Sequence, residues 1–200
     1  MGKLEEKKQK KTEKLFHAAL ELFTTKGFHE TSISDITRKA GMAKGTFYLY
    51  FNDKYDIRNQ LISIESSRLF SQADAALQQT DITVFEDKII FIIDYILDLL
   101  DQDRQLMTFI AKNLGWGVFK SALIHPKTDY TLDFYDVYIR MIEDSPHEFR
   151  NSEVLLFMLI ELVGSTCYSI ILYNEPMDIE TYKSYLYKAV KDIIRGQMVD

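Results

Sequence analysis

The chain has 200 residues, which is enough for one sizeable hydrophobic core and a small second unit. Hydrophobic residues make up 46% and charged residues 27% of the chain, a globular composition that excludes large-scale disorder. With only three prolines and eight glycines, the chain favours long helices over a turn-rich β architecture.

The net charge of −6 is unevenly distributed along the chain. Residues 1–60 contain 12 Lys and Arg against 8 Asp and Glu, a net charge of +4, whereas the rest of the chain carries −10. This asymmetry is typical of a small nucleic-acid-binding head on an acidic body. Chance enrichment of lysine in a frayed N-terminal tail would give the same numbers, so charge alone does not decide.

Three features bear on where the protein works. The N-terminal segment is charged and no apolar core follows it, so it is not a secretory signal. The apolar stretch Val154–Tyr173 contains Glu161 and a polar middle, which favours a buried helix of a soluble protein over a membrane span. The single cysteine, Cys167, cannot form an internal disulfide. We therefore expect a cytoplasmic protein that has no membrane partner.

Four helices are predicted in the N-terminal part of the chain. From apolar stripes at helical spacing and from capping residues, they are placed at about residues 7–26, 33–40, 44–50 and 54–79. Gly27 ends the first helix, and Ser32 with Asp35 forms a capping box that opens the second. Asp53 is the predicted N-cap of the fourth and longest helix.

The remainder of the chain is helical by pattern and shows no internal repeat. Its start and stop signals are a capping box at Thr83–Glu86, a break at Gly115–Gly117, a first helical turn at Pro126, an N-terminus at Asn151 and an N-cap at Asp178. We therefore expect an all-α fold of about nine helices. A three-helix helix-turn-helix head would occupy residues 1–53, and a helical ligand-sensing and dimerisation domain residues 54–200.

The second and third predicted helices, joined by a glycine turn, form a helix-turn-helix pattern. In such motifs the second helix of the pair enters the major groove of DNA. Phe47 and Phe51 are four residues apart and would face the core. The side chains then left for the DNA side are those of Lys44, Thr46, Tyr48 and Tyr50. A packed bundle with solvated Lys and Tyr residues would explain any one of them, but not the joint pattern.

Residues 31–57, TSISDITRKAGMAKGTFYLYFNDKYDI, closely resemble the DNA-binding signature of the tetracycline-repressor (TetR/AcrR) family. The resemblance covers about residues 10–60 and implies a dimeric, ligand-responsive transcription regulator. Carried over position by position, it implies DNA contacts by Thr31, Ser34, Lys44, Gly45, Thr46, Tyr48, Tyr50 and Lys54, the last as a phosphate clamp. The chain departs from the family at Thr37, usually Ala, and at Ala43, usually a Ser N-cap, whose loss costs about 1 kcal/mol. Leu49 stands at a variable position.

The same resemblance implies a ligand cavity in the C-terminal part. The candidate lining residues are Phe91, Tyr95, Phe109, Trp116, Phe134, Tyr138, Met158 and Glu161. Aromatic residues at helical spacing are more often ordinary core. For Glu161, a position at the rim of the pocket or a salt bridge with Arg140 or Lys112 is the favoured interpretation, and a partner for a cationic ligand is the alternative.

The family also implies a dimer formed by the last two long helices. The residues predicted for this interface are Gly164, Ser165, Tyr168, Leu172, Tyr182 and Leu186. Gly164 would let another helix approach closely. The simpler interpretation is that both helices belong to the core of one protomer.

Enzyme signatures are missing from the sequence, which contains no HExxH, GxSxG or GxxxxGK motif. We expect no catalytic residues, no metal and no cofactor. The prediction is a DNA-binding transcription regulator, a ligand-released repressor that binds a palindromic operator as a homodimer and senses an unknown, hydrophobic small molecule. The alternative is a helical adaptor whose head no longer binds DNA. Lys44, Tyr48 and Lys54 favour the regulator.

Overall fold

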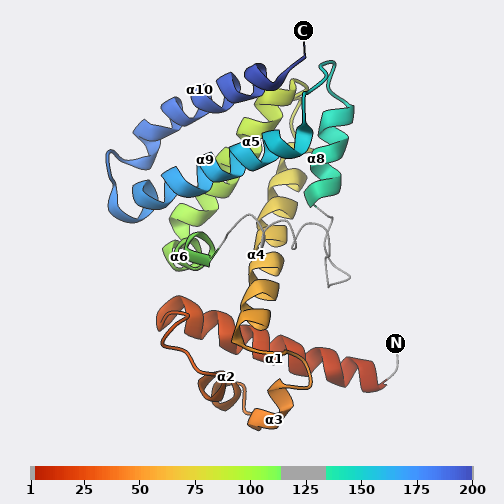
Figure 1. Cartoon of the computed structure of the whole chain (residues 1–200), viewed down its shortest axis with the longest axis vertical. Coiled ribbons are helices and arrows are strands. Elements are labelled where there is room, and N and C mark those ends of the chain that lie inside the picture. The colour runs from red at the N-terminus through yellow and green to blue at the C-terminus, as the bar shows by residue number, and fades with distance from the viewer. Residues whose placement is uncertain (1–2, 114–133, 200) are drawn as a thin grey trace.

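The computed structural model describes residues 3–113 and 134–199, and within these residues the protein is all-α, as predicted. The helices α1, α2 and α3 form a head at one end of the molecule, and α4 connects this head to a helical body (Figure 1). The nine helices of the described residues are α1 (Lys3–Thr25), α2 (Ile33–Lys39), α3 (Lys44–Phe47), α4 (Lys54–Leu77), α5 (Phe85–Gln102), α6 (Arg104–Asn113), α8 (Phe134–Glu143), α9 (Ser152–Tyr173) and α10 (Ile179–Gln197). The predicted break at Gly115–Gly117 and the predicted helix start at Pro126 lie outside the described residues.

Local signals determine the geometry of the head. The Ser32 hydroxyl accepts a hydrogen bond from the backbone N–H of Asp35 at 3.1 Å, and the Asp35 carboxylate accepts one from the Ser32 N–H at 3.0 Å. This confirms the capping box, and the backbone hydrogen bond from Ser32 holds the pKa of Asp35 well below its usual range. Gly27 and Gly41 take φ values of +93° and +67°, which only glycine adopts without strain. They end α1 and α2.

Helix α4 belongs to both parts of the molecule. It begins as predicted, with the Asp53 carboxylate accepting hydrogen bonds from the N–H groups of Tyr55 and Asp56, both at 2.8 Å. Its first turns bury Ile57 and Leu61, which belong to the same continuous core as the residues of the head. The division of the chain between residues 53 and 54 stays a prediction, because one helix crosses from head to body.

Two signals in the body were predicted wrongly or missed. The capping box at Thr83–Glu86 is wrong, because Val84 is the N-cap of α5 and makes no side-chain capping bond. The break between α5 and α6 was not predicted from the sequence. There Asp103 leaves the helical conformation, with φ −122° and ψ 76°, and its carboxylate accepts the N–H of Leu106 at 3.0 Å. An aspartate in this role starts a new helix, so α6 leaves α5 at Asp103.

Ion pairs fasten α10 to α5. The Lys183 ammonium, whose side chain is 12% exposed, lies 2.8 Å from the Asp94 carboxylate and 2.5 Å from that of Asp98. Tyr187 donates a further hydrogen bond to Asp94. Burial alone would lower the pKa of Lys183, but the hydrogen bonds to the two aspartates outweigh it and raise the pKa. The aspartates of α5 therefore hold the last helix in place.

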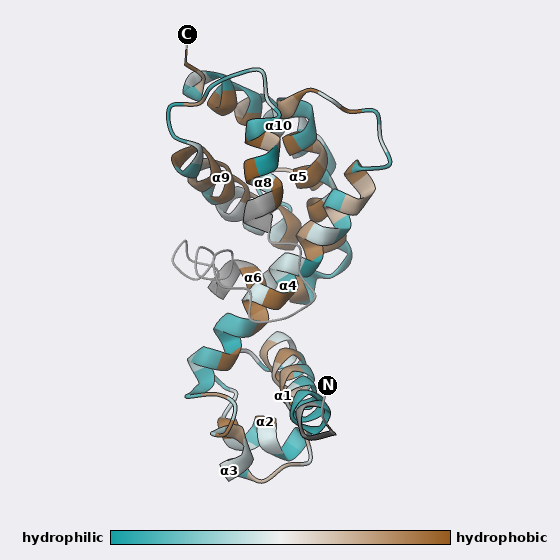
Figure 2. Ribbon diagram, turned by 90° about the vertical axis from the view of Figure 1, so that its right-hand side faces the viewer, coloured by the Kyte–Doolittle hydropathy of each residue, from teal (hydrophilic) through white to brown (hydrophobic). Residues whose placement is uncertain are grey.

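Helix α9 is the most apolar helix of the body (Figure 2). By length and composition alone it could cross a membrane, since its mean hydropathy over 18 residues is 2.0. Only 33% of that window is buried, so the predicted buried helix is buried along one face only. The inner face carries Leu155 and Leu159, and the outer face exposes Val154 and Met158. This outer face is apolar surface that one protomer leaves uncovered.

Candidate functional site

The helix α3 divides its side chains between the core and the solvent. Phe47 is fully buried and Phe51 is 2% exposed, as the sequence predicts. On the opposite side Lys44 is exposed, Tyr48 is 53% exposed and Leu49 is 75% exposed. The outward side therefore combines a cation, a phenol and an aliphatic side chain at the end of the head that lies farthest from the body (Figure 1).

The other residues predicted to contact DNA lie around this exposed side. Gly45 is exposed, and a Cβ placed there would have no atom within 4 Å. Thr46 and Ser34 are half-buried, and Tyr50 packs against the core. We define the recognition face as Lys44, Gly45, Tyr48 and Leu49, with Thr46, Ser34 and Tyr50 at its border. From the sequence, Leu49 was noted only as a variable position of the motif and was not among the predicted DNA contacts.

The prediction for Thr31 needs correction. This residue is 1% exposed, and its hydroxyl donates to the carbonyl of Gly27 at 2.8 Å, with a longer contact to that of Leu22 at 3.3 Å. The Leu22 carbonyl in the last turn of α1 also accepts the N–H groups of Lys26 and Gly27, and Gly27 follows the helix. The Thr31 hydroxyl is thus engaged with the chain that leaves α1 and does not reach the surface where DNA would lie.

Lys54 likewise differs from its predicted role as a phosphate clamp. Its ammonium donates to the backbone carbonyls of Phe28 at 2.8 Å, His29 at 3.3 Å and Thr31 at 2.9 Å. It also lies 4.4 Å from the centre of the Phe28 ring. An ammonium has three N–H donors, and all three are engaged within the head. Lys54 therefore ties the start of α4 to the loop between α1 and α2.

Replacing Lys54 by Met should destabilise the head and leave the salt dependence of DNA binding unchanged. The lost charged hydrogen bonds are partly exposed, so we expect a loss of about 1.5 kcal/mol, the lower end for such bonds. The matched control is Lys44→Met on the recognition face, which should leave stability unchanged and lower the slope of log affinity against log salt by about one. Thermal melts and salt titrations measure both. If Lys54→Met instead keeps normal stability and lowers the slope of log affinity against log salt, Lys54 contacts a DNA phosphate as the resemblance implied.

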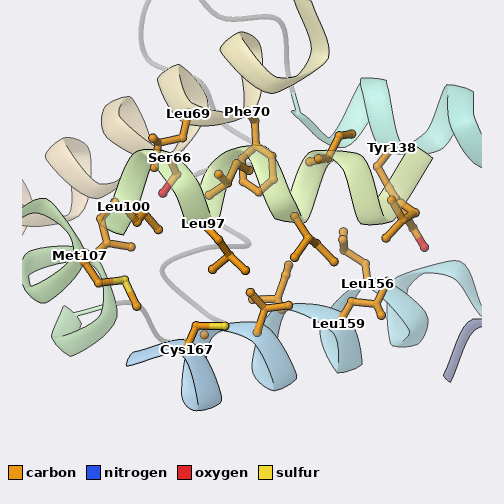
Figure 3. Close-up of a pocket in the computed structure, with 18 of the residues that line it drawn as sticks. Ser66, Leu69, Phe70, Leu97, Leu100, Met107, Tyr138, Leu156, Leu159 and Cys167 are labelled. Atoms are coloured by element: carbon orange, nitrogen blue, oxygen red, sulfur yellow. The ribbon is translucent and has the colours of Figure 1, made fainter. Parts of the chain in front are cut away.

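The body contains a cavity of about 140 Å³ enclosed by α4, α5, α6, α8 and α9 (Figure 3). Most of its lining is aliphatic, and none of the lining residues carries a charge. They are Ser66, Leu69, Phe70, Ile89, Ile92, Ile93, Ile96, Leu97, Leu100, Met107, Ile110, Tyr138, Met141, Leu156, Leu159, Ile160, Val163, Gly164 and Cys167. A cavity of this chemistry offers water few hydrogen-bond partners and suits an apolar molecule.

Comparisons with known proteins connect the head to one family. Residues 15–61 match the sequence model described as bacterial regulatory proteins, tetR family. The head of the chain is that of a tetR-family transcriptional regulator. Its head is a DNA-binding helix-turn-helix, and its relatives are regulators rather than enzymes, which favours DNA binding over the adaptor alternative.

Three relatives show how far this similarity extends. The uncharacterized HTH-type transcriptional regulator YvdT of Bacillus subtilis is 28% identical over 191 residues, which covers 90% of this chain and 93% of the relative. A tetR-family transcription regulator from Shewanella sp. PV-4 shares the fold with a TM-score of 0.68 at 16% identity, covering 95% and 99% of the two chains. The regulator FadR of Bacillus subtilis, in complex with stearoyl-CoA, has a TM-score of 0.62 at 16% identity, covering 92% and 97%.

Of the pocket residues predicted for this tetR-family regulator, Tyr138 lines the cavity. Its hydroxyl donates to the Ser152 carbonyl at 2.7 Å, so the residue contributes to the cavity wall without offering this hydroxyl to a ligand. Phe109 is buried elsewhere, stacked on Phe23 of α1 with ring centres 5.9 Å apart. Trp116 lies outside the described residues, as does the side chain of Phe134.

The remaining pocket predictions are corrected by the structure of the regulator. Phe91 and Tyr95 are stacked with ring centres 6.3 Å apart and do not line this cavity. Met158 and Glu161 are exposed on the outer face of α9, on the side away from the cavity. An exposed carboxylate needs no buried partner, so Glu161 requires neither the salt bridge nor the cationic ligand. The sequence signal that was overlooked is the run of isoleucines and leucines on α5.

Two of the predicted dimer residues also have other roles in the regulator. Gly164 lines the cavity, and Leu186 is 1% exposed within the core of one protomer. Ser165 is exposed on the outer side of α9. The other three, Tyr168, Leu172 and Tyr182, are half-buried and pack against the core. Leu186, which is buried in the core of one protomer, therefore cannot contact another, and the other five residues stay predictions.

Proposed function

We propose that this regulator binds a palindromic operator as a homodimer in the cytoplasm, represses transcription, and is released by an apolar small molecule held in the cavity of the body. The observation that carries this proposal is the cavity itself, whose lining contains no charged side chain. An apolar cavity lined in part by α4, the helix that joins the head to the body, could bind an effector.

Binding as a dimer follows from the size of the recognition face. One α3 of four residues offers few base contacts, and a second head supplies a second half-site about 34–36 Å, or one turn of DNA, away. The outer face of α9 supports this arrangement, since Val154 and Met158 are 41% and 39% exposed on a helix of high hydropathy. On neighbouring α10, Tyr185 is 61% exposed. A second copy of the chain would cover these side chains.

For the effector we propose a long alkyl or acyl chain. The lining offers no basic side chain to pair with a carboxylate and no acidic one to pair with an amine, so an uncharged part of the effector fills the cavity. FadR of Bacillus subtilis, which shares the fold, is described in complex with stearoyl-CoA. This supports a fatty acyl chain here, with its polar head group outside the described lining.

Helix α6 supports the release of DNA by such an effector. Met107 and Ile110 line the cavity, whereas Phe109, which lies between them in sequence, stacks on Phe23 of the head. One helix therefore contacts both the effector site and α1. An acyl chain that displaces Met107 and Ile110 would disturb the Phe109–Phe23 contact, because a ten-residue helix moves as one body.

The only cysteine of the chain reports on the occupancy of the cavity. Cys167 is fully buried and lines the cavity, and burial raises the pKa of its thiol to about 11. Because the thiolate is the reactive form, alkylation by a small neutral maleimide should be slow and is best followed near pH 9. We expect stearoyl-CoA to slow this alkylation about tenfold and to release bound DNA in a gel shift.

Coenzyme A without an acyl chain is the control for this experiment and should change neither the alkylation rate nor DNA binding. If stearoyl-CoA leaves both unchanged as well, the cavity does not hold acyl chains. Equal effects of coenzyme A and stearoyl-CoA would place the recognition on the head group and contradict an apolar effector site.

A further inference from the structure

Leu49 is the most exposed large hydrophobic side chain in the part of the chain that the structure describes. It is 75% exposed, compared with 53% for the adjacent Tyr48. A side chain that is this exposed contributes little to the stability of the head. An exposed aliphatic group on a surface that binds another molecule is instead a candidate contact.

The position of Leu49 places it on the recognition face. It follows Gly45 by one helical turn, as Tyr48 follows Lys44, so the four residues share one side of α3 and the turn that ends it. The Leu49 N–H donates to the Thr46 carbonyl at 3.2 Å, which fixes the backbone of this turn. Gly45 has no side chain, and the space around it is open, so nothing on α3 shields Leu49 from an approaching groove.

The chemistry of the major groove then identifies the partner of Leu49. The edges of the base pairs present hydrogen-bond donors and acceptors there, and thymine adds the only methyl group. A leucine can make no hydrogen bond to a base or a phosphate, but it can bury this methyl. We propose that Leu49 packs on the C5-methyl group of a thymine and so specifies thymine at one position of each half-site. This inference rests on the proposed insertion of the recognition face into the operator.

The experiment begins with DNA duplexes selected from a random library by the full chain. In a selected duplex, each thymine is replaced in turn by deoxyuridine, which lacks only the methyl group and keeps the same hydrogen-bonding edge. Burial of one methyl group corresponds to about a fourfold change in affinity. We expect one position per half-site at which deoxyuridine weakens binding about fourfold, and little effect at the other thymines.

Two variants assign this effect to Leu49. With Leu49→Ala the thymine and deoxyuridine duplexes should bind equally well, while the thermal melt stays unchanged because the side chain is exposed. The matched control is Val84→Ala, which truncates an aliphatic side chain that is 52% exposed at the start of α5, and it should keep the fourfold difference.

Each outcome decides between the proposals. A fourfold difference that persists in Leu49→Ala would assign the methyl group to another residue or to DNA shape and overturn the inference. Selected duplexes without any deoxyuridine-sensitive position would overturn it while leaving operator binding intact. If the chain selects no duplex at all, the proposed operator binding fails, and the role of Leu49 fails with it.

Discussion

Replacing Met158 by Glu is expected to convert the proposed dimer into monomers and to remove tight operator binding. Met158 is 39% exposed on the outer face of α9, so the protomer should fold normally with a carboxylate there. In a two-fold dimer each substitution appears twice in the interface. An uncompensated buried charge costs about 3 kcal/mol or more, which corresponds to a dimer at least 100-fold weaker.

Light scattering at micromolar concentration and a gel shift measure the two effects. Val84→Glu is the control, because it places the same charge on an exposed aliphatic position at the N-cap of α5, which is not part of the outer face of α9. It should remain dimeric and bind DNA normally. A Met158→Glu protein with the mass of two chains, or a wild-type protein with the mass of one, would show that the outer face of α9 does not form a dimer interface.

Gly164→Leu is expected to give a regulator that no longer responds to the proposed effector. Gly164 lines the cavity, and a Cβ built there meets no atom within 4 Å, so the added side chain fills empty space in the effector site. Competition with the effector should cost about 1–3 kcal/mol, a 5- to 150-fold loss of effector affinity. Replacing a helical glycine should also stabilise the protein by about 0.5–1 kcal/mol.

Titration with stearoyl-CoA in a gel shift measures this response. Ser165→Leu makes a similar enlargement one residue further along α9, at an exposed position, and should leave the effector response unchanged. If Gly164→Leu instead lowers operator binding in the absence of effector and lowers the dimer mass, the glycine lies at the seam between protomers, as the sequence alone had suggested.

The head could be predicted from the sequence because its determinants are local. The capping box of Ser32 and Asp35 joins residues three apart, and Phe47 and Phe51 are one helical turn apart. Residues this close in sequence determine the local backbone geometry without contacts from the rest of the chain. The role of Lys54 is different, because its three carbonyl partners lie 23 to 26 residues earlier in the chain. A motif can mark this lysine but cannot show what it contacts.

The cavity could not be located from sequence because five helices contribute to it. Aromatic residues were preferred as lining, but Phe109 is used to join the body to the head and Tyr138 alone of the described candidates lies in the wall. On α9 the inward and outward faces are both apolar, so hydropathy did not show that Gly164 faces inward and Met158 outward. Only packing against other helices distinguishes the two faces.

The helix α4 can act as a lever between the cavity wall and the head. Its 16 residues between Lys54, tied to the head, and Phe70, in the cavity wall, span about 24 Å at 1.5 Å per residue. A tilt of about 5° at Phe70 would swing the Lys54 end by about 2 Å, as a lever arm of that length does. In a two-fold dimer the two arms swing in opposite directions, so the heads would change their separation by about 4 Å. Successive major grooves on one side of DNA are about 34 Å apart, so this change in separation would prevent the two α3 helices from fitting both half-sites at once.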